Sequence, residues 1–401
     1  MVTEERTVGS GGTMDLAFTP EQEVFRNRVR AFMARTLNDP FYQENRHRGG
    51  LRSAVSRWWD RAVFEAGLAG LSWPTAYGGQ GLGQVEEIIF AEECYRAGAP
   101  EGIAWAGKGL LGPVLLVHGT EAQRQQFLPR ILSVDDVWCQ GYSEPEAGSD
   151  LAALRSRAVR DGDGWRLSGE KIWTSTVKDA DWSFVLARTD PAAPKHRGLS
   201  LFLVPLHEPG VTVRPLTEVT GDDSFGSMHF DEVFVPDSQR VGEVNQGWRV
   251  ANAILGFERG VTAIEQHGRY HRQFMAMLET WASLPSGNPL ADPAVRDEAA
   301  SLLGELQILR FWCLELITEL QAGREPGFSA STLKYFYGDL FWRIGRTSLR
   351  YQGPAVQRPG DGYQHYEYLW ALGTNIFAGT SEIQLDIIAE HILGLPRGDR
   401  S

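Results

Sequence analysis

The sequence predicts an α+β protein in which a helical segment, a β segment and a second helical segment follow one another. Two observations predict this class. The spacing of apolar residues changes from a helical to an alternating pattern near Trp138, and it becomes helical again after Gly247. With 401 residues, the chain is also too long for one ordinary hydrophobic core, which favours several domains.

The first segment begins with residues 1–14, a polar and glycine-rich stretch that we expect to be a disordered tail. Thr19 then offers a capping hydroxyl, Pro20 suits the first helical position, and Gln22 is placed to complete a capping box. Further helical patterns extend through Val55 to Ala66, Gln84 to Ala97 and Ala122 to Leu132. Residues 15–135 are therefore predicted to form an N-terminal helical domain.

The second segment, residues 136–245, carries short runs of β-forming residues that are separated by turn sequences such as Asp161 to Gly164. The predicted strands are Gly164 to Ser168, Trp182 to Ala187, Leu199 to Val204, Val211 to Leu216 and Met228 to Val235. This pattern predicts a middle β domain.

The third segment, residues 246–401, returns to helical spacing. Val250, Ile254 and Phe257 form an apolar stripe that predicts a long amphipathic helix. Further helices are predicted over Ala299 to Gln321, over Ser331 to Tyr351 and after Gly379. Together they predict a C-terminal helical domain.

Composition and charge exclude several classes of function. A net charge of −12 argues against a nucleic-acid or anionic-membrane binder, because both need a basic surface. No apolar run is long enough to span a membrane, and the three cysteines show no spacing that predicts a disulfide framework or a zinc site. We therefore expect a cytoplasmic protein without a metal centre.

Two segments carry the most specific pattern in the chain. The first is Trp138 to Asp150, with the core Ser143-Glu144-Pro145-Glu146-Ala147-Gly148-Ser149-Asp150, and the second is Gly169 to Ser175. Together they resemble the flavin-binding signature of acyl-CoA dehydrogenases. The ending Gly379-Thr380-Ser381-Glu382-Ile383-Gln384 resembles the same family. The resemblance implies an N-terminal α-helical domain, a middle β-barrel or sandwich domain and a C-terminal four-helix bundle.

The resemblance also implies FAD as the cofactor, because a flavin needs hydrogen bonds at its polar edge and aromatic surface along its ring. By this resemblance, Ser143 is expected at the flavin edge and Trp173 beside the ring, with Ser175 as a second hydroxyl. Ser149 matches a position near the phosphorylated part of the ligand. The full set of expected cofactor-binding residues is Gln140, Tyr142, Ser143, Ser149, Trp173, Ser175, Thr380 and Glu382.

The reaction that the resemblance implies is α,β-dehydrogenation of an acyl thioester, in which a carboxylate removes the α-proton and a hydride passes to flavin N5. Many family members carry the base directly before the Gly-Thr of the C-terminal motif, where this chain has Ala378. A minority place it before an Arg on the first long C-terminal helix, so Glu258, followed by Arg259, is the candidate base. Leu255 and Arg259 join Ser149 as expected substrate contacts, and Ala378 keeps its backbone N–H for the thioester oxygen.

The expected partners are an acyl-CoA or carrier-protein thioester, an electron-transfer flavoprotein or other external acceptor, and further copies of related chains. Phe336, Phe341 and Trp342 offer an apolar contact area for such an oligomer. Two alternatives stay open. The first is a base-deficient subunit of a heteromeric acyl-CoA dehydrogenase, which Ala378 suggests. The second is a flavin oxidase or monooxygenase on the same fold.

Overall fold

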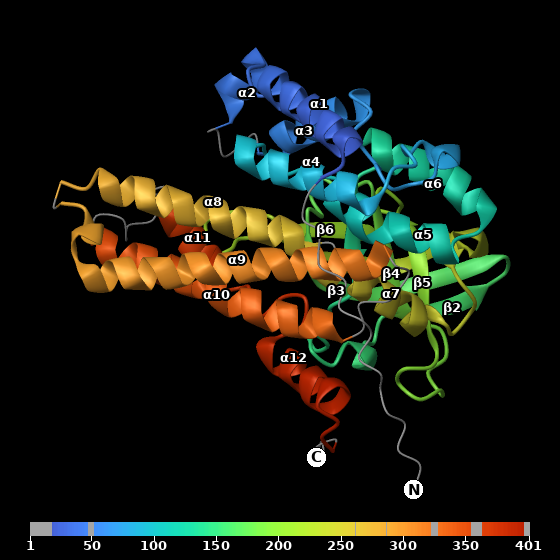
Figure 1. Cartoon of the computed structure of the whole chain (residues 1–401). Coiled ribbons are helices and arrows are strands. Elements are labelled where there is room, and N and C mark those ends of the chain that lie inside the picture. Colours follow the sequence, from blue (N-terminus) through green and yellow to red (C-terminus); the bar gives the residue numbers. More distant parts are fainter. Residues whose placement is uncertain are drawn as a thin grey trace, which may run out of the picture.

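The computed structural model describes residues 18–46, 52–260, 262–285, 287–321, 328–353 and 363–396. The predicted disordered tail at residues 1–14 lies outside these residues. In Figure 1 the N-terminal helices lie above the rest, the sheet lies to one side, and the long C-terminal helices extend away on the other. The predicted order of helical, β and helical parts is confirmed.

Short helices make up the N-terminal part. They are α1 (Pro20–Thr36), α2 (Pro40–Asn45), α3 (Arg52–Glu65), α4 (Gln84–Ala97), a π-helix (Ala106–Leu111), α5 (Gly112–His118) and α6 (Glu121–Ser133). The capping box predicted at the start of α1 is present. Thr19 Oγ1 accepts from the Gln22 N–H at 3.3 Å, and the Thr19 N–H donates to Gln22 Oε1 at 2.9 Å.

The strands of the middle part form one sheet. They are β1 (Trp138–Gly141), β2 (Arg157–Asp161), β3 (Gly164–Ser175), β4 (Trp182–Arg188), β5 (Leu199–Pro205), β6 (Val211–Leu216), β7 (Phe225–Pro236) and β8 (Arg240–Val241). The order across the sheet is β6-β7-β3-β2-β4-β5-β8, and β1 pairs parallel with β4. β1 is thus part of the sheet. The loop that follows it lies next to β3, because the Ile172 N–H donates to the Ser143 carbonyl oxygen.

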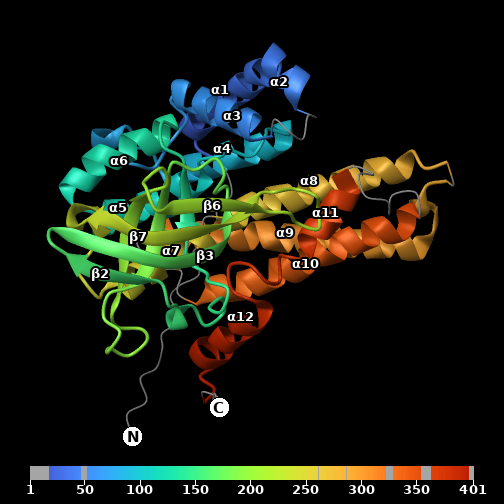
Figure 2. The same ribbon diagram turned by 180° about the vertical axis from the view of Figure 1, so that it is seen from behind.

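The C-terminal part consists of long helices. They are α7 (Gly247–Gly260), α8 (Thr262–Ala282), α9 (Pro293–Gln321), α10 (Ser329–Gln352), α11 (Tyr363–Ala371) and α12 (Ser381–Ile387), which continues as a π-helix (Ile388–Ile392). Figure 2 shows α8, α9 and α10 side by side, with α12 at the end of the chain lying against α10. The three-part architecture that the sequence predicts is therefore present.

Helix α4 connects the two helical parts. Its Glu92 accepts hydrogen bonds from Arg26 of α1 at 3.5 Å and from Arg310 of α9 at 2.8 Å. Tyr95 lies so close to α8 that a Cβ added at Gly268 would meet its ring at 1.9 Å. Only glycine fits this crossing, and the contact fixes α8 relative to the N-terminal helices.

Of Phe336, Phe341 and Trp342, which are predicted to offer apolar contact area for an oligomer, Phe341 cannot do so because its side chain is buried within the chain. Phe341 is fully buried and stacks on Tyr270 of α8 at 4.1 Å, while Phe336 and Trp342 are half-buried. The apolar face of α10 is the side that packs on α8 and α9. Helical spacing showed that an apolar face exists but could not show which neighbour covers it.

Candidate functional site

The two motif segments predicted to bind flavin lie next to each other. The Ile172 N–H donates to the Ser143 carbonyl oxygen at 2.9 Å, so the loop after β1 hydrogen-bonds to the middle of β3. Ser143 is half-buried at this junction, and Trp173 follows Ile172 directly. This backbone hydrogen bond thus brings Ser143 and Trp173 to the same end of the sheet.

A buried ion pair holds this loop in place. Lys171 has no exposed surface, and its Nζ donates to Glu144 Oε1 at 2.8 Å and to the Tyr142 carbonyl oxygen at 3.1 Å. Glu144 also accepts from the backbone N–H groups of Arg155 at 2.6 Å and Ser156 at 2.9 Å. Each oxygen of the carboxylate therefore has a partner, as a buried charge requires.

The pKa values of this pair follow from its burial. Burial raises the pKa of Glu144, but the Lys171 ammonium and the donors around the carboxylate outweigh it, so the pKa lies below its ordinary value. Burial lowers the pKa of Lys171 to about 8, although Glu144 favours its charged form. Both groups serve as a scaffold for the loop rather than as exposed chemical groups.

Trp173 is exposed although it lies within a strand. Its side chain is 62% accessible and its φ is 60°, a left-handed value that is uncommon for a bulky residue. The register between β3 and β7 shifts between Lys171 and Thr174, which marks a bulge that turns the indole away from the sheet. A large exposed aromatic surface on a strained backbone is typical of a binding site, and it fits a flat ligand such as a flavin ring.

Each of the two motif segments holds a buried polar atom without a partner in the described part of the chain. The Gln140 Nε2 and the Thr174 Oγ1 are buried, and within the described ranges neither has a hydrogen-bond partner. Buried polar atoms normally have one, so these atoms fit a ligand with polar edges. Tyr142 is 5% exposed, and its ring packs edge-on against Phe184 with 6.0 Å between the ring centroids. This contact anchors the loop to β4. Ser175 is half-buried at the end of β3.

Ser149 lies in an exposed turn of the same loop. The next residue, Asp150, accepts two hydrogen bonds from the Lys195 ammonium, each at 2.9 Å. Lys195 belongs to the hairpin loop between β4 and β5. The turn at Ser149 is thereby tied to that hairpin loop, whose next residues line a pocket.

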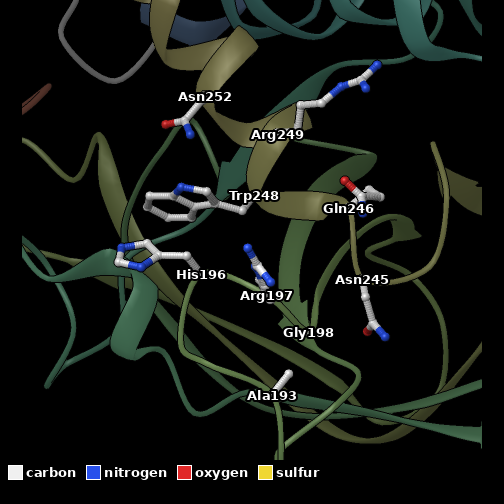
Figure 3. A pocket seen from close by; sticks show the side chains of 9 residues that line it. All are labelled: Ala193, His196, Arg197, Gly198, Asn245, Gln246, Trp248, Arg249 and Asn252. Carbon is white, nitrogen blue, oxygen red and sulfur yellow. The ribbon is translucent and has the colours of Figure 1, made fainter.

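The pocket lies between the β4–β5 hairpin loop and the start of α7 and has a volume of about 680 Å³. It is lined by Ala193, His196, Arg197, Gly198, Asn245, Gln246, Trp248, Arg249 and Asn252. Figure 3 shows His196 and Trp248 facing each other, and their ring centroids are 5.0 Å apart. The two arginines and the indole make it suited to a phosphorylated aromatic ligand. Sequence reasoning missed it, because its two walls are far apart in the chain.

Helix α7 carries the predicted base. Leu255 is half-buried and packs against the core that α7 shares with the N-terminal helices. The helix backbone reaches Gly260, so positions 258 and 259 are helical. The side chains of Glu258 and Arg259 lie outside the described residues, so their predicted roles stay predictions.

The last predicted positions lie in the turn before α12. Ala378 has a φ of 54° and Gly379 a φ of 87°. Within the described part of the chain, neither the Ala378 N–H nor the Gly379 N–H has an acceptor. Thr380 caps α12 by accepting from the Ile383 N–H at 3.3 Å. Glu382 is exposed, and its own N–H and the Thr380 hydroxyl hold its pKa below the usual value.

The described residues offer neither a metal site nor a membrane-spanning helix. They contain no group of three or more His, Cys, Asp or Glu side chains that could hold a metal ion. Among the helices that the structure describes, none is long and apolar enough to cross a membrane.

The chain is similar to known proteins along most of its length. Family models described as the N-terminal, middle and C-terminal domains of acyl-CoA dehydrogenase match residues 19–135, 139–233 and 245–393. A protein named acyl-CoA dehydrogenase IpdE1 from Mycobacterium tuberculosis is 37% identical over 382 residues, which cover 94% of this chain and 98% of that protein.

Solved structures show the same similarity. The Tcur3481-Tcur3483 steroid ACAD is 32% identical, with a TM-score of 0.84, and the match covers 96% of this chain and 100% of that one. The ChsE4-ChsE5 complex from Mycobacterium tuberculosis is also 32% identical, with a TM-score of 0.81 and the same coverage.

Proposed function

This chain belongs to the acyl-CoA dehydrogenase family of FAD-dependent oxidoreductases, and we propose how its own residues carry out the α,β-dehydrogenation of an acyl thioester. The observation that carries the proposal is the hydrogen bond from the Ile172 N–H to the Ser143 carbonyl at 2.9 Å. It joins the two motif segments beside the exposed Trp173.

The cofactor-binding residues would be those around the bulge of β3. Gln140 and Thr174 supply buried polar atoms that lack partners in the described residues, Trp173 supplies aromatic surface, and Ser143 and Ser175 supply hydroxyls. We propose that Tyr142 supports the loop from behind, and that Thr380 and Glu382 approach from α12. FAD, when bound, accepts the hydride that leaves the β-carbon of the substrate.

We propose Glu258 as the base that removes the α-proton. Ala378 has no side chain able to accept a proton, and it stands where many family members carry the base. A carboxylate near the apolar side of α7 would lose water when the substrate binds, which raises the pKa of a carboxyl group and makes it a stronger base. The backbone N–H of Ala378, which has no acceptor in the described residues, would donate to the thioester oxygen.

The pocket beside α7 would hold the phosphorylated end of CoA. Arg197 and Arg249 can donate to phosphate oxygens, and Trp248 can stack on an adenine ring. Positions 248, 252, 255 and 259 recur with helical spacing along one face of α7, so the face that lines the pocket continues toward Leu255 and Arg259. Ser149 is linked to the same pocket through Asp150 and Lys195.

An oligomer of related chains and an external electron acceptor complete the proposal. Exposed apolar side chains on α9 and on the segment after α12 offer a contact surface. They are Leu303, Ile308, Phe311, Ile392, Leu393 and Leu395. Similarity to the ChsE4-ChsE5 complex supports a partner of related sequence, and a cytoplasmic location fits a CoA thioester. Similarity to a steroid ACAD supports a steroid-derived acyl group.

The test is to purify the protein, alone and with a related partner chain, and to determine bound FAD after denaturation. Flavin bleaching is then followed without oxygen against linear, branched and steroid-derived acyl-CoA thioesters. We expect bound FAD and bleaching by at least one thioester. A protein that takes up no FAD in either form contradicts the proposal. Rapid reoxidation of the reduced protein by oxygen would point to an oxidase instead.

The pocket has a test of its own. Arg249→Ala removes a charged phosphate donor, so we expect KM for an acyl-CoA to rise about tenfold, given the 1.5–3 kcal/mol of a charged hydrogen bond. An acyl-pantetheine, which lacks the nucleotide, should show the same KM with both proteins. A KM for acyl-CoA that does not change would place the nucleotide elsewhere.

A further inference from the structure

The turn before α12 has an unusual backbone. Ala378 and Gly379 are consecutive and both left-handed, with φ values of 54° and 87°. This conformation is unfavourable for alanine and persists only where the surroundings impose it. The neighbours of this turn therefore hold it in place.

Gln384 is the side chain that contacts the turn most directly. It lies one turn into α12 and is 1% exposed. Its Nε2 donates to the Ala378 carbonyl oxygen at 3.1 Å and to the Gly379 carbonyl oxygen at 3.3 Å. A Cβ added at Gly379 would meet this nitrogen at 2.4 Å, so the contact also requires glycine there.

The other end of the turn is held as well. The buried Lys334 of α10 donates to the Thr374 carbonyl oxygen. The Ser381 N–H donates to the Asn375 carbonyl oxygen at 3.0 Å, and the Ser381 and Asn375 side chains are hydrogen-bonded at 3.2 Å. The carbonyl groups of the turn are thus occupied, whereas the Ala378 N–H has no acceptor among the described residues.

We infer that Gln384 is a positioning residue for the reaction: it holds the left-handed turn so that the Ala378 N–H keeps its direction toward the thioester oxygen. This inference rests on the proposed function. When the α-proton leaves, negative charge develops on that oxygen, and a donor fixed in advance stabilises the charge without reorganising. Without the hydrogen bonds from Gln384, the turn would have to adopt the reactive conformation again in each catalytic cycle.

The test is Gln384→Met, which keeps the length of the side chain and removes its donor. Loss of a whole oxyanion donor costs about 10²-fold in kcat or more, so a loosened donor should cost about tenfold, with KM changed less than kcat. The carbonyl stretch of a bound ¹³C-labelled enoyl-CoA should shift less from its value in water than it does in the wild type. Gly379→Ala, which displaces Gln384 Nε2, should change both quantities in the same direction.

Two further variants separate positioning from folding. Gln364→Met also removes a buried glutamine of the C-terminal helices, one that bonds to Ser348 and to the Gln273 carbonyl instead, so kcat and the carbonyl band should not change. Gln384→Glu donates only when it is protonated, so its kcat relative to the wild type at the same pH should rise as the pH falls.

The outcomes distinguish this inference from the proposed function. An active wild type together with a Gln384→Met variant of unchanged kcat and carbonyl band overturns the inference alone. So does an equal loss of kcat in Gln364→Met. A wild type that binds FAD but is bleached by no thioester overturns both.

Discussion

The two sides of the candidate site are held in different ways. On the flavin side, the side chains of Glu144 and Lys171 form a buried ion pair within one part of the molecule. On the thioester side, the turn at Ala378 offers a backbone N–H, and α7 depends on packing between the helical parts.

This difference explains which positions can change. Every residue except proline has a backbone N–H whatever its side chain, so alanine at position 378 keeps the proposed oxyanion donor. A base needs a carboxylate, so its role has to pass to another residue, and we propose Glu258. In this proposal the base lies on α7, while the backbone donor stays at the turn before α12.

The largest expected effect tests the flavin side. Lys171→Met leaves Glu144 buried without its cation, which typically costs about 3–5 kcal/mol of unfolding free energy. Chemical denaturation measures this loss, and FAD content should fall with it. The matched control is Lys195→Met, whose ion pair with Asp150 is half-exposed and should contribute less than about 1 kcal/mol. Equal losses of unfolding free energy in both variants would mean that the buried ion pair stabilises the protein no more than the exposed one.

The next effect tests the packing behind the thioester side. Gly268→Ala forces a methyl group against Tyr95, and overpacking of this kind costs about 1–3 kcal/mol. Thermal unfolding should show the loss, and kcat should fall if α7 shifts with α8. At Gly304 of α9 an added Cβ meets nothing within 4 Å, so Gly304→Ala should be neutral or stabilise by up to about 1 kcal/mol. A Gly268→Ala variant with unchanged unfolding free energy would show that α4 and α8 can move apart at little cost.

The smallest effect concerns an ion cluster at the far end of the sheet. Arg240, together with Trp165 and Arg160, holds the pKa of Asp237 at about 2, below the ordinary 3.8. Its stabilisation is present above about pH 4 and is lost as the pH falls toward 2. Because the site is partly exposed, Asp237→Asn should cost only about 1 kcal/mol at pH 7.

The pH dependence is the sharper part of that test. Unfolding of both proteins between pH 7 and pH 3 should show the difference narrowing as the pH falls. Asp231→Asn, at an exposed position of β7, should stay within about 0.5 kcal/mol of the wild type throughout. A difference for Asp237→Asn that is constant with pH would assign its effect to hydrogen bonding alone.

The sequence predicted local features well and distant contacts poorly. The capping box at Thr19 depends on residues close together in the chain, so its pattern could be recognised in the sequence. The two motif segments are also short, and the structure places them next to each other. The pocket at His196 and Trp248 forms only when a hairpin loop meets a helix some 50 residues later, which no local pattern indicates. The stacking of Phe341 on Tyr270 of α8 is also a contact between distant segments, which the helical spacing of α10 could not indicate.

The role of Glu258 as the base is tested most directly by the anaerobic stopped-flow rate of flavin reduction in Glu258→Gln. We expect FAD content to stay unchanged and the rate to fall about 10²-fold or more, because glutamine keeps the shape but cannot take a proton. Glu279→Gln, the same change at an exposed position of α8, should reduce flavin at the wild-type rate. Adding Ala378→Glu to Glu258→Gln should restore part of the rate. A Glu258→Gln variant that reduces flavin as fast as the wild type would contradict the account and require another base.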